Sequence, residues 1–139
     1  MQETAQRIGT VAQHSGLPIK TIRYYAELGL LKVSGRTEGG YRLFSEDVFV
    51  RLSFIKRAQH LGLTLADIKE LLDIYDRGEL PCDRVKEKLV QQITAVERQI
   101  QQMQDLKQEL QGLLHGWSTI PRPSEHTICP ILQQRLSGA

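Results

Sequence analysis

The sequence contains only two cysteines, Cys82 and Cys129, and no pair of cysteines separated by two residues. It also lacks an HExxH motif and a glycine-rich phosphate-binding loop, and no nucleophile stands with a recognisable base. Such motifs mark many metalloenzymes, nucleotide-binding enzymes and hydrolases. Without them an enzymatic function has no support, and we expect a protein that is not an enzyme.

Long apolar runs are missing as well. None approaches the ~20 residues that a membrane-spanning helix needs, and Met1 to Ile8 is polar, unlike the apolar core of a secretory signal. We therefore expect a cytoplasmic protein without membrane contact. In a reducing compartment the two cysteines are better explained as metal ligands, redox thiols or buried apolar residues than as a structural disulfide.

Neither sign of charge dominates the chain, whose formal net charge is +2, but the charges are unevenly distributed. Residues 1–60 carry nine Lys or Arg against five acids, whereas residues 61–139 carry nine against eleven. A basic front and a mildly acidic back favour a nucleic-acid-binding region followed by a neutral body.

Glycine and proline are absent from Asp83 to Gln111, where apolar residues recur every three or four positions. The pattern predicts one long helix from Asp83 to Leu114 with a single apolar stripe. At 1.5 Å per residue this helix is roughly 48 Å long, longer than a small domain is wide. It therefore needs a partner, most simply a second copy of itself. The stripe consists of Val85, Leu89, Ile93, Val96, Ile100, Met103, Leu106, Leu110 and Leu113.

Two short helices are predicted near the start of the chain. The first begins at Val11, behind a capping-box pattern of Thr10 and Gln13, and ends near Gly16. The second runs from Pro18 to Leu28, since proline suits a first helical turn. Two short helices joined by a few residues that include glycine form a helix-turn-helix.

The second helix presents side chains suited to DNA. Ile19, Ile22 and Ala26 share the spacing that faces the first helix, which leaves basic, hydroxyl and tyrosine side chains for the remaining surface, although one tyrosine can pack. Those side chains supply donors for phosphates and base edges. A plain amphipathic surface helix is the alternative. The candidate DNA contacts are Lys20, Thr21, Arg23, Tyr24 and Tyr25.

A hairpin is predicted next. Leu30 to Val33 and Tyr41 to Phe44 read as two strands around a turn-rich loop. A hairpin after a helix-turn-helix is a wing, and Arg36, Tyr41 and Arg42 would reach the flanking DNA backbone. A purely structural hairpin is the alternative.

Two further helices are predicted after the hairpin. Ser45 caps the first, which Gly62 ends, and Thr64 caps the second with Asp67 three residues on. Their buried positions are Val48, Leu52, Ile55, Ala58, Leu65, Ile68, Leu71, Leu72 and Tyr75. The residues expected to be solvated, with some phosphate contact, are Arg51, Lys56 and Arg57.

Residues 7–75 resemble the DNA-binding domain of the MerR family of bacterial transcription regulators. The resemblance is carried by TIRYYAELGLL, GGYRLF and GLTLADIKELL, which occur in this order with short spacers. It implies a mostly α-helical homodimer whose winged helix-turn-helix domains are joined by an antiparallel coiled coil. It also implies a palindromic operator in double-stranded promoter DNA, which effector binding distorts so that RNA polymerase can use the promoter.

The resemblance divides the chain into three parts. Residues 1–76 form the winged helix-turn-helix domain with its two further helices. Residues 77–114 form a hinge and the long dimerisation helix. Residues 115–139 form an effector-binding loop and a short terminal helix.

The family motifs also imply DNA contacts. On the recognition helix these are Thr21, Arg23 and Tyr24, and on the wing Tyr41 and Arg42. The remaining candidates rest on their chemistry alone. They are Lys20, Tyr25 and Arg36.

The long helix keeps the two cysteines apart within one chain, because Cys82 starts it and Cys129 follows its end. The fifteen residues that follow Leu114, up to Cys129, would reach back only if nearly fully extended, at about 3.3 Å per residue. In the antiparallel dimer that the resemblance implies, Cys82 of one chain lies beside the loop of the other. The two thiols then meet across the subunit boundary, twice per dimer.

The placement of Cys82 resembles MerR-family members that sense soft divalent metals, namely mercury, zinc, cadmium or lead. The sequence lacks the further loop cysteine of the mercury and zinc members. Two thiolates suffice for linear mercury, whereas zinc wants four ligands. His126 and His115 are candidate additional ligands, although a lone histidine is more often a surface residue.

Two other functions stay open. One is a thiol redox or electrophile sensor of the same fold, because the start of a helix favours a thiolate at Cys82. The other is a coiled-coil interaction protein that does not bind DNA, which would leave the Arg and Tyr residues of the second helix unexplained.

Overall fold

The structure is a computed structural model that describes residues 5–115 and 122–133. It confirms the mostly helical fold that the sequence predicts. The chain divides into two compact units, Met1–Gln92 and Ile93–Ala139, and the division falls inside the long helix. Among the described residues, no helix is long and apolar enough to cross a membrane. The elements in chain order are β1 (Gln6–Arg7), α1 (Ile8–Ser15), α2 (Ile19–Glu27), β2 (Val33–Arg36), β3 (Arg42–Phe44), α3 (Val48–His60), α4 (Leu65–Asp76) and α5 (Cys82–Leu114).

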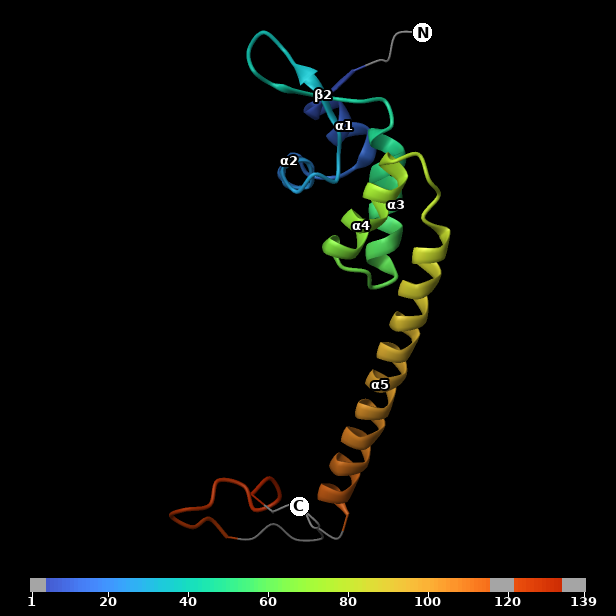
Figure 1. Ribbon diagram of the computed structural model, residues 1–139. Coiled ribbons are helices and arrows are strands. Elements are labelled where there is room, and N and C mark those ends of the chain that lie inside the picture. Colours follow the sequence, from blue (N-terminus) through green and yellow to red (C-terminus); the bar gives the residue numbers. More distant parts are fainter. Residues whose placement is uncertain (1–4, 116–121, 134–139) are drawn as a thin grey trace. The chain divides into compact units, whose positions relative to one another are not determined.

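Helices α1 and α2 form the helix-turn-helix (Figure 1). The predicted capping box at Thr10 is wrong, because α1 begins at Ile8, directly after β1, and no side chain caps it. Gly16 ends α1 with a φ of 75°, and its N–H donates to the Ala12 carbonyl at 3.0 Å. Glycine takes this left-handed conformation without steric cost. Pro18 is extended and precedes α2, as its fixed φ allows.

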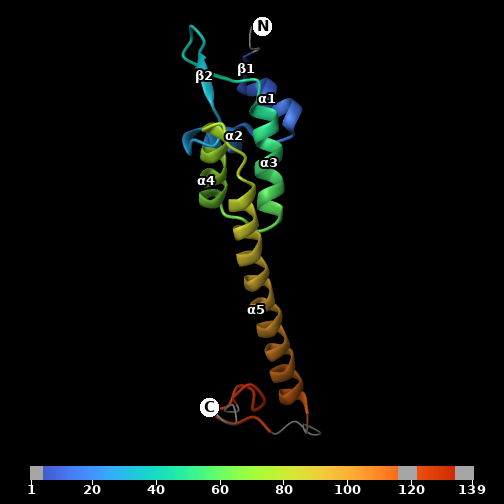
Figure 2. The same cartoon turned by 45° about the vertical axis from the view of Figure 1, so that its right-hand side comes forward.

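The wing is part of a three-stranded antiparallel sheet in the order β1-β3-β2. Arg36 of β2 lies opposite Arg42 of β3, and the register shifts between Val33 and Gly35. The sequence did not predict β1, which is only two residues long. Leu30 and Leu31 are buried core residues before β2 rather than strand residues. Figures 1 and 2 show the β2 hairpin projecting beyond α1 and α2.

The first unit has one hydrophobic core, to which α1, α2, β3, α3 and α4 contribute. Most predicted core positions of α3 and α4 are confirmed, but Tyr75 of α4 is 45% exposed and does not belong to the core. Ile19 of α2, which was predicted to face α1, is 43% exposed. The buried apolar residues are Val11, Ile22, Tyr25, Leu30, Leu31, Phe44, Val48, Leu52, Ile55, Ala58, Leu63, Ile68, Leu71 and Leu72.

Arg51 of α3 is buried, which corrects the expectation that it is solvated. Its Nε donates to the Leu30 carbonyl at 2.7 Å, and its Nη1 lies 2.6 Å from Asp76 Oδ1. Burial disfavours the charged Asp76 carboxylate, but Arg51 and then Lys32 outweigh it and hold the pKa of Asp76 below its ordinary value. Arg51 thus joins the residues after α2 to the end of α4.

The starts of α3 and α4 differ. Ser45 does not cap α3 as predicted, because the helix begins at Val48 and the Ser45 hydroxyl donates to Asp47 Oδ1 at 2.5 Å. The capping box of α4 is confirmed. The Asp67 N–H donates to Thr64 Oγ1 at 3.1 Å, and the Thr64 N–H donates to Asp67 Oδ2 at 3.1 Å. This reciprocal pair satisfies two N–H groups that the first turn leaves open.

Helix α5 has 33 residues and confirms the predicted long helix. Its first turns belong to the first unit, where Val85 packs against the core and Lys88 is buried. Its large apolar residues from Ile93 to Leu110 are exposed, whereas Leu113 is half-buried. After the helix, the described residues include a bridge between Ser124 and Thr127 and a turn over residues 130–133. The predicted terminal helix from Ile128 to Leu136 extends outside the described residues, and its described part forms this turn.

Candidate DNA-binding surface and effector site

Helix α2 is oriented by the two residues it buries, Ile22 and Tyr25. Burial of these side chains turns the opposite surface of the helix to solvent, where Lys20, Arg23 and Tyr24 are exposed and Thr21 is half-buried. Tyr24 is 50% exposed. Cationic and phenolic donors on one exposed helix surface are the groups that contact phosphates and base edges.

Tyr25 takes a different position from the other predicted contacts of α2. It is 8% exposed, and its hydroxyl donates to Gln59 Oε1 of α3 at 3.0 Å. Its ring lies 6.4 Å from that of Tyr24, centre to centre. The hydroxyl is therefore occupied within the fold, and Tyr25 orients α2 by packing.

The wing presents the second group of predicted contacts. Arg36 is exposed, and its Nη1 donates to the Gly40 carbonyl at 2.9 Å, which closes the hairpin loop. Tyr41 is 71% exposed, and a Cβ at Gly39 would lie 3.1 Å from its ring, so glycine there gives the ring room. Arg42 is half-buried, and its Nη2 lies 3.9 Å from Glu27 Oε1 at the end of α2. This ion pair connects the wing to the helix-turn-helix.

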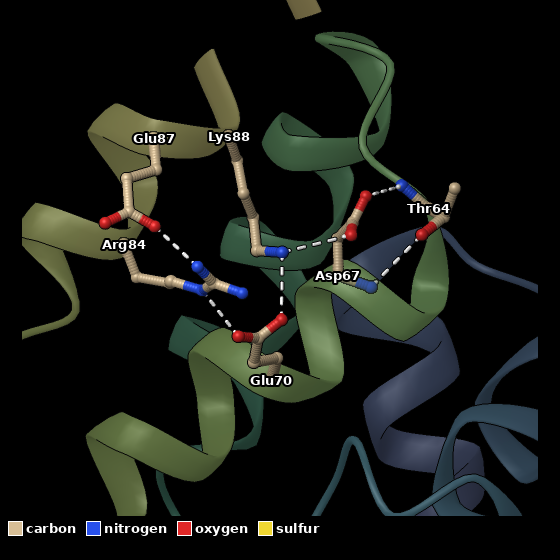
Figure 3. A network of polar contacts seen from close by, with 6 residues as sticks. All are labelled: Thr64, Asp67, Glu70, Arg84, Glu87 and Lys88. Atoms are coloured by element: carbon tan, nitrogen blue, oxygen red, sulfur yellow. Dashed lines mark hydrogen bonds and ion pairs between the residues drawn. The ribbon is translucent and has the colours of Figure 1, made fainter. Parts of the chain in front are cut away.

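Cys82 is the first residue of α5 and is exposed. A group of charged residues holds the following turns of α5 against α4 (Figure 3). The Lys88 ammonium lies 2.9 Å from Glu70 Oε2 and 3.1 Å from Asp67 Oδ1. Arg84 Nε donates to Glu70 Oε1, and its Nη1 donates to Glu87 Oε2, both at 2.5 Å. We call Asp67, Glu70, Arg84 and Lys88 the α4–α5 clamp.

The clamp shifts the pKa of its members in the direction that keeps them charged. The backbone hydrogen bond from Thr64, followed by the hydrogen bond from Lys88, lowers the pKa of Asp67. Hydrogen bonds from Arg84 and then Lys88 lower the pKa of Glu70. The hydrogen bond to Glu70 raises the pKa of Lys88, although burial opposes it. The buried ammonium of Lys88 thus joins α5 to two carboxylates of α4.

Cys129 lies in the loop after α5 and is half-buried. Gln133 organises this loop. Its Oε1 accepts from the N–H groups of Ile128 at 2.7 Å and Cys129 at 3.0 Å, and its Nε2 donates to the His126 carbonyl at 3.2 Å. The side chains of His126 and His115 are exposed.

The predicted DNA contacts all belong to the first unit, on α2 and the β2–β3 hairpin. The predicted metal ligands are divided: Cys82 belongs to the first unit, and His115, His126 and Cys129 belong to the second. In the described part of a single chain, no group of three or more His, Cys, Asp or Glu could hold a metal ion. Neither cysteine is in a disulfide.

Sequence patterns did not predict the residues that hold the first turns of α5 and the loop of Cys129. Lys88 carries a signal, because it follows Val85 by three residues and therefore shares the buried side of α5. Glu70 lies three residues after Asp67 on α4, the spacing that places two carboxylates side by side. Gln133 has no comparable signal, since its partners are backbone groups of an irregular loop.

Comparison with known proteins identifies the chain. The family described as MerR HTH family regulatory protein matches residues 6–74, and the one described as MerR, DNA binding matches residues 49–113. A mercuric resistance operon regulatory protein of Bacillus cereus is 39% identical over 127 residues, which cover 91% of this chain and 94% of the relative. The chain belongs to the MerR family. It is therefore a DNA-binding transcription regulator of a metal-responsive group and not an enzyme.

Two solved structures of MerR regulators extend this result. The regulator PbrR691 of Ralstonia metallidurans CH34, in complex with lead(II), is 31% identical and superimposes with a TM-score of 0.74, covering 91% of this chain and 96% of that one. The MerR regulator of Bacillus megaterium MB1, in complex with mercury(II), is 32% identical with a TM-score of 0.59, covering 87% and 91%. The similarity thus includes most of each chain and not the DNA-binding domain alone.

Proposed function

We propose that the protein is a soft-metal sensor that binds a palindromic operator as a homodimer and distorts promoter DNA for RNA polymerase when the metal binds. The observation that carries this proposal is the position of the two free thiols, one at the first residue of α5 and the other in the loop after it. Relatives similar over nearly the whole length are named for mercury resistance or hold lead or mercury. Such a regulator works in the cytoplasm, where the promoter is.

The partner of α5 is a second copy of the chain. Between Ile93 and Leu110 the apolar stripe is exposed, with Ile100 at 52% and Leu110 at 52%. A stripe of this kind along a long helix is covered by a second helix in a coiled coil. An antiparallel pairing brings Cys82 of one chain beside the Cys129 loop of the other. In this pairing both thiols reach one site, and neither chain has to fold back along its own helix.

The DNA-binding surface consists of the exposed side chains of α2 and the wing. Arg23 and Tyr24 contact the recognition sequence together with Thr21, and Tyr41 and Arg42 contact the flanking backbone. Lys20 and Arg36 add phosphate contacts. Tyr25 is left out of this set because it is buried and bonded to Gln59. The functional division into residues 1–76, 77–114 and 115–139 remains part of the proposal.

The donor set fits a soft divalent ion such as mercury, cadmium, lead or zinc. Thiolate sulfur is the ligand that these ions prefer, and imidazole nitrogen suits zinc as well. Cys82 and Cys129 would hold the ion, with His126 and His115 as further ligands. The chemistry supplied by the bound ion is a bridge between two subunits, which biases one arrangement of the DNA-binding domains.

Metal titration tests the proposal. The reduced dimer is titrated anaerobically with mercury, cadmium, lead and zinc, and ultraviolet thiolate-to-metal absorption is recorded. We expect absorption with at least one ion, and its loss in both Cys82→Ser and Cys129→Ser. Binding no tighter than micromolar for every ion would overturn metal sensing.

A mixture of the two single mutants tests the shared site. If the ligands come from opposite chains, a Cys82→Ser/Cys129→Ser heterodimer regains one of its two sites. Each mutant homodimer, which lacks one thiol in both sites, is the control. A complete site in a chain held monomeric contradicts the cross-subunit geometry.

DNA binding is tested with Arg23→Ala and, as a matched control, Lys107→Ala on α5. Arg23→Ala should weaken operator binding and reduce the preference for the operator over unrelated duplex DNA, because a lost base contact costs about 1–3 kcal/mol of discrimination. Lys107→Ala should change neither. Unchanged operator affinity and preference in Arg23→Ala would remove Arg23 from the DNA-binding surface.

The second candidate is a thiol redox or electrophile sensor, favoured by the exposure of Cys82 at a helix start. It predicts that diamide or an alkylating agent changes operator response while no metal does. Metal-dependent absorption that requires both cysteines decides against it.

A further inference from the structure

The side chain of Gln133 uses both of its polar atoms on the loop that carries Cys129. Its Oε1 accepts two backbone N–H groups, those of Ile128 and Cys129, and its Nε2 donates to the carbonyl of His126. The Gln133 N–H donates to the Cys129 carbonyl at 3.1 Å. One residue therefore closes a ring of hydrogen bonds around residues 126–129.

Two of the joined residues are candidate ligands. The Gln133 amide links the main chain of His126 to that of Cys129, so the separation of these two residues is set before any ion arrives. Pro130 restrains the backbone directly after Cys129, because its ring fixes φ. The Ser124 carbonyl accepts from the Thr127 N–H at 3.4 Å and closes the preceding turn.

We propose that Gln133 is a positioning residue of the metal site, which presets the backbone of His126 and Cys129 as a preformed half of that site. This inference rests on the proposed metal function and says which chain segment is organised in advance. The second half is Cys82 of the partner subunit. Groups that hold metal ligands in place, without touching the metal, strengthen binding by restricting the ligands to productive positions.

Binding the metal and holding the loop in place are two different roles, and a mutation at His126 alone would not distinguish them. Gln133 contacts only the main chain of His126, so His126→Ala removes the imidazole and leaves the carbonyl that Gln133 binds. If His126 is a ligand, His126→Ala changes the type of coordination. Gln133→Met, in contrast, keeps every ligand and loosens their backbone.

The experiment compares Gln133→Met and Gln133→Glu in the full-length reduced dimer, titrated with cadmium and with mercury. Gln133→Met should weaken cadmium affinity by about 10- to 100-fold, the range for residues that position metal ligands. Glutamate keeps the acceptor for the two N–H groups, so Gln133→Glu should bind cadmium more tightly than Gln133→Met. Mercury, which needs only two thiolates, should lose less affinity than cadmium.

Gln101→Met is the matched control, since Gln101 donates to Asp105 within α5. It should leave metal affinity unchanged. Operator affinity of the metal-free protein should be the same in all variants, which shows that they fold and dimerise. The position of the thiolate-to-metal absorption band should stay constant in Gln133→Met, because the ligands remain the same.

The outcomes distinguish this inference from the proposed function. If the unmodified protein binds no metal, both fail. If it binds metal and Gln133→Met binds cadmium within about twofold of it, only the role of Gln133 fails.

Discussion

The first turns of α5 lie against α4, whereas the later turns expose their apolar side chains. Before Gln92 the helix buries Lys88, packs Val85 on the core and forms ion pairs with two carboxylates of α4. A Cβ on Gly62 would overlap the side chain of Gln92, so α5 also approaches the α3–α4 turn closely. From Ile93 to Leu110 every residue of the stripe is exposed, from 40% at Val96 to 66% at Met103.

The difference divides one continuous helix into a packed part and an exposed part. The early part completes its contacts within the chain, largely through charge. The later part exposes most of its apolar stripe in the described residues, and this is the surface that the proposed second copy would cover. Mutations in the two parts should consequently affect different properties, namely the stability of the first unit and the association of two chains.

The largest effect is expected from Ile100→Asp in the exposed stripe. A charge without a partner in a buried interface costs about 3 kcal/mol or more, which is on the order of 100-fold in the association constant. Sedimentation equilibrium should show a dimer that dissociates at higher protein concentration, while circular dichroism retains the helical signal of the first unit.

Gln108→Asp introduces the same charge on the same helix outside the apolar stripe and is the control for Ile100→Asp. It should leave the dimer intact. Equal dissociation in both variants would mean that charge alone, and not the stripe, governs association. If the original chain is monomeric at all concentrations, the exposed stripe of α5 does not bind a second copy.

The next effect is expected from Lys88→Met in the clamp. The substitution keeps an unbranched side chain and removes the donor that Asp67 and Glu70 share. Because both carboxylates are partly exposed and can rehydrate, we expect a loss of about 1.5 kcal/mol, the lower end for hydrogen bonds to charged groups. Urea unfolding of the first unit measures it.

Lys86→Met, two residues earlier on the exposed side of α5, should change the urea midpoint little. Dimer dissociation should be the same in Lys86→Met and Lys88→Met, since neither residue belongs to the exposed stripe. A Lys88→Met chain as stable as the original would show that apolar packing alone holds α5 on α4.

Sequence patterns predicted α5 well because its signal is local. Twenty-nine residues without glycine or proline and a regular apolar spacing depend on no distant partner. The same reasoning explains the success at Thr64, where cap and partner are three residues apart. It also explains why β1 was missed, since two residues cannot show an alternating pattern.

The contacts of Arg51 and Gln133 could not be predicted from the sequence. Arginine is rarely buried without partners, and those of Arg51 lie 21 and 25 residues away in the chain. Only the packed fold brings Leu30 and Asp76 to it. Gln133 forms hydrogen bonds with backbone groups of its own loop, and nothing in the sequence distinguishes it from any other glutamine near a turn.

A smaller effect is expected from Thr64→Ala at the start of α4. The substitution removes the acceptor of the Asp67 N–H, and the loss of such a cap costs about 1 kcal/mol. Thr64→Ser keeps the hydroxyl and should restore the stability. Combining Thr64→Ala with Lys88→Met should give less than the sum of the two losses, because both act on Asp67. Additive losses in the free energy of unfolding by urea would mean that the cap and the clamp act independently.

The smallest effect is the pH dependence that the clamp adds. Folding lowers the pKa of Asp67 and Glu70 from ordinary values of 3.8 and 4.5, so the unfolded chain binds more protons in this range. The stabilisation is therefore complete above the ordinary values and is lost as pH falls through the lower folded-state values. Since Lys88 causes part of each shift, the difference in urea midpoint between the original chain and Lys88→Met should shrink from pH 7 to pH 3. A difference that stays constant over this range would mean that Lys88 stabilises α5 through its methylene chain and not through its charge. The early turns of α5 would then be held by apolar contacts, the same kind of contact that the later turns offer to the proposed second chain.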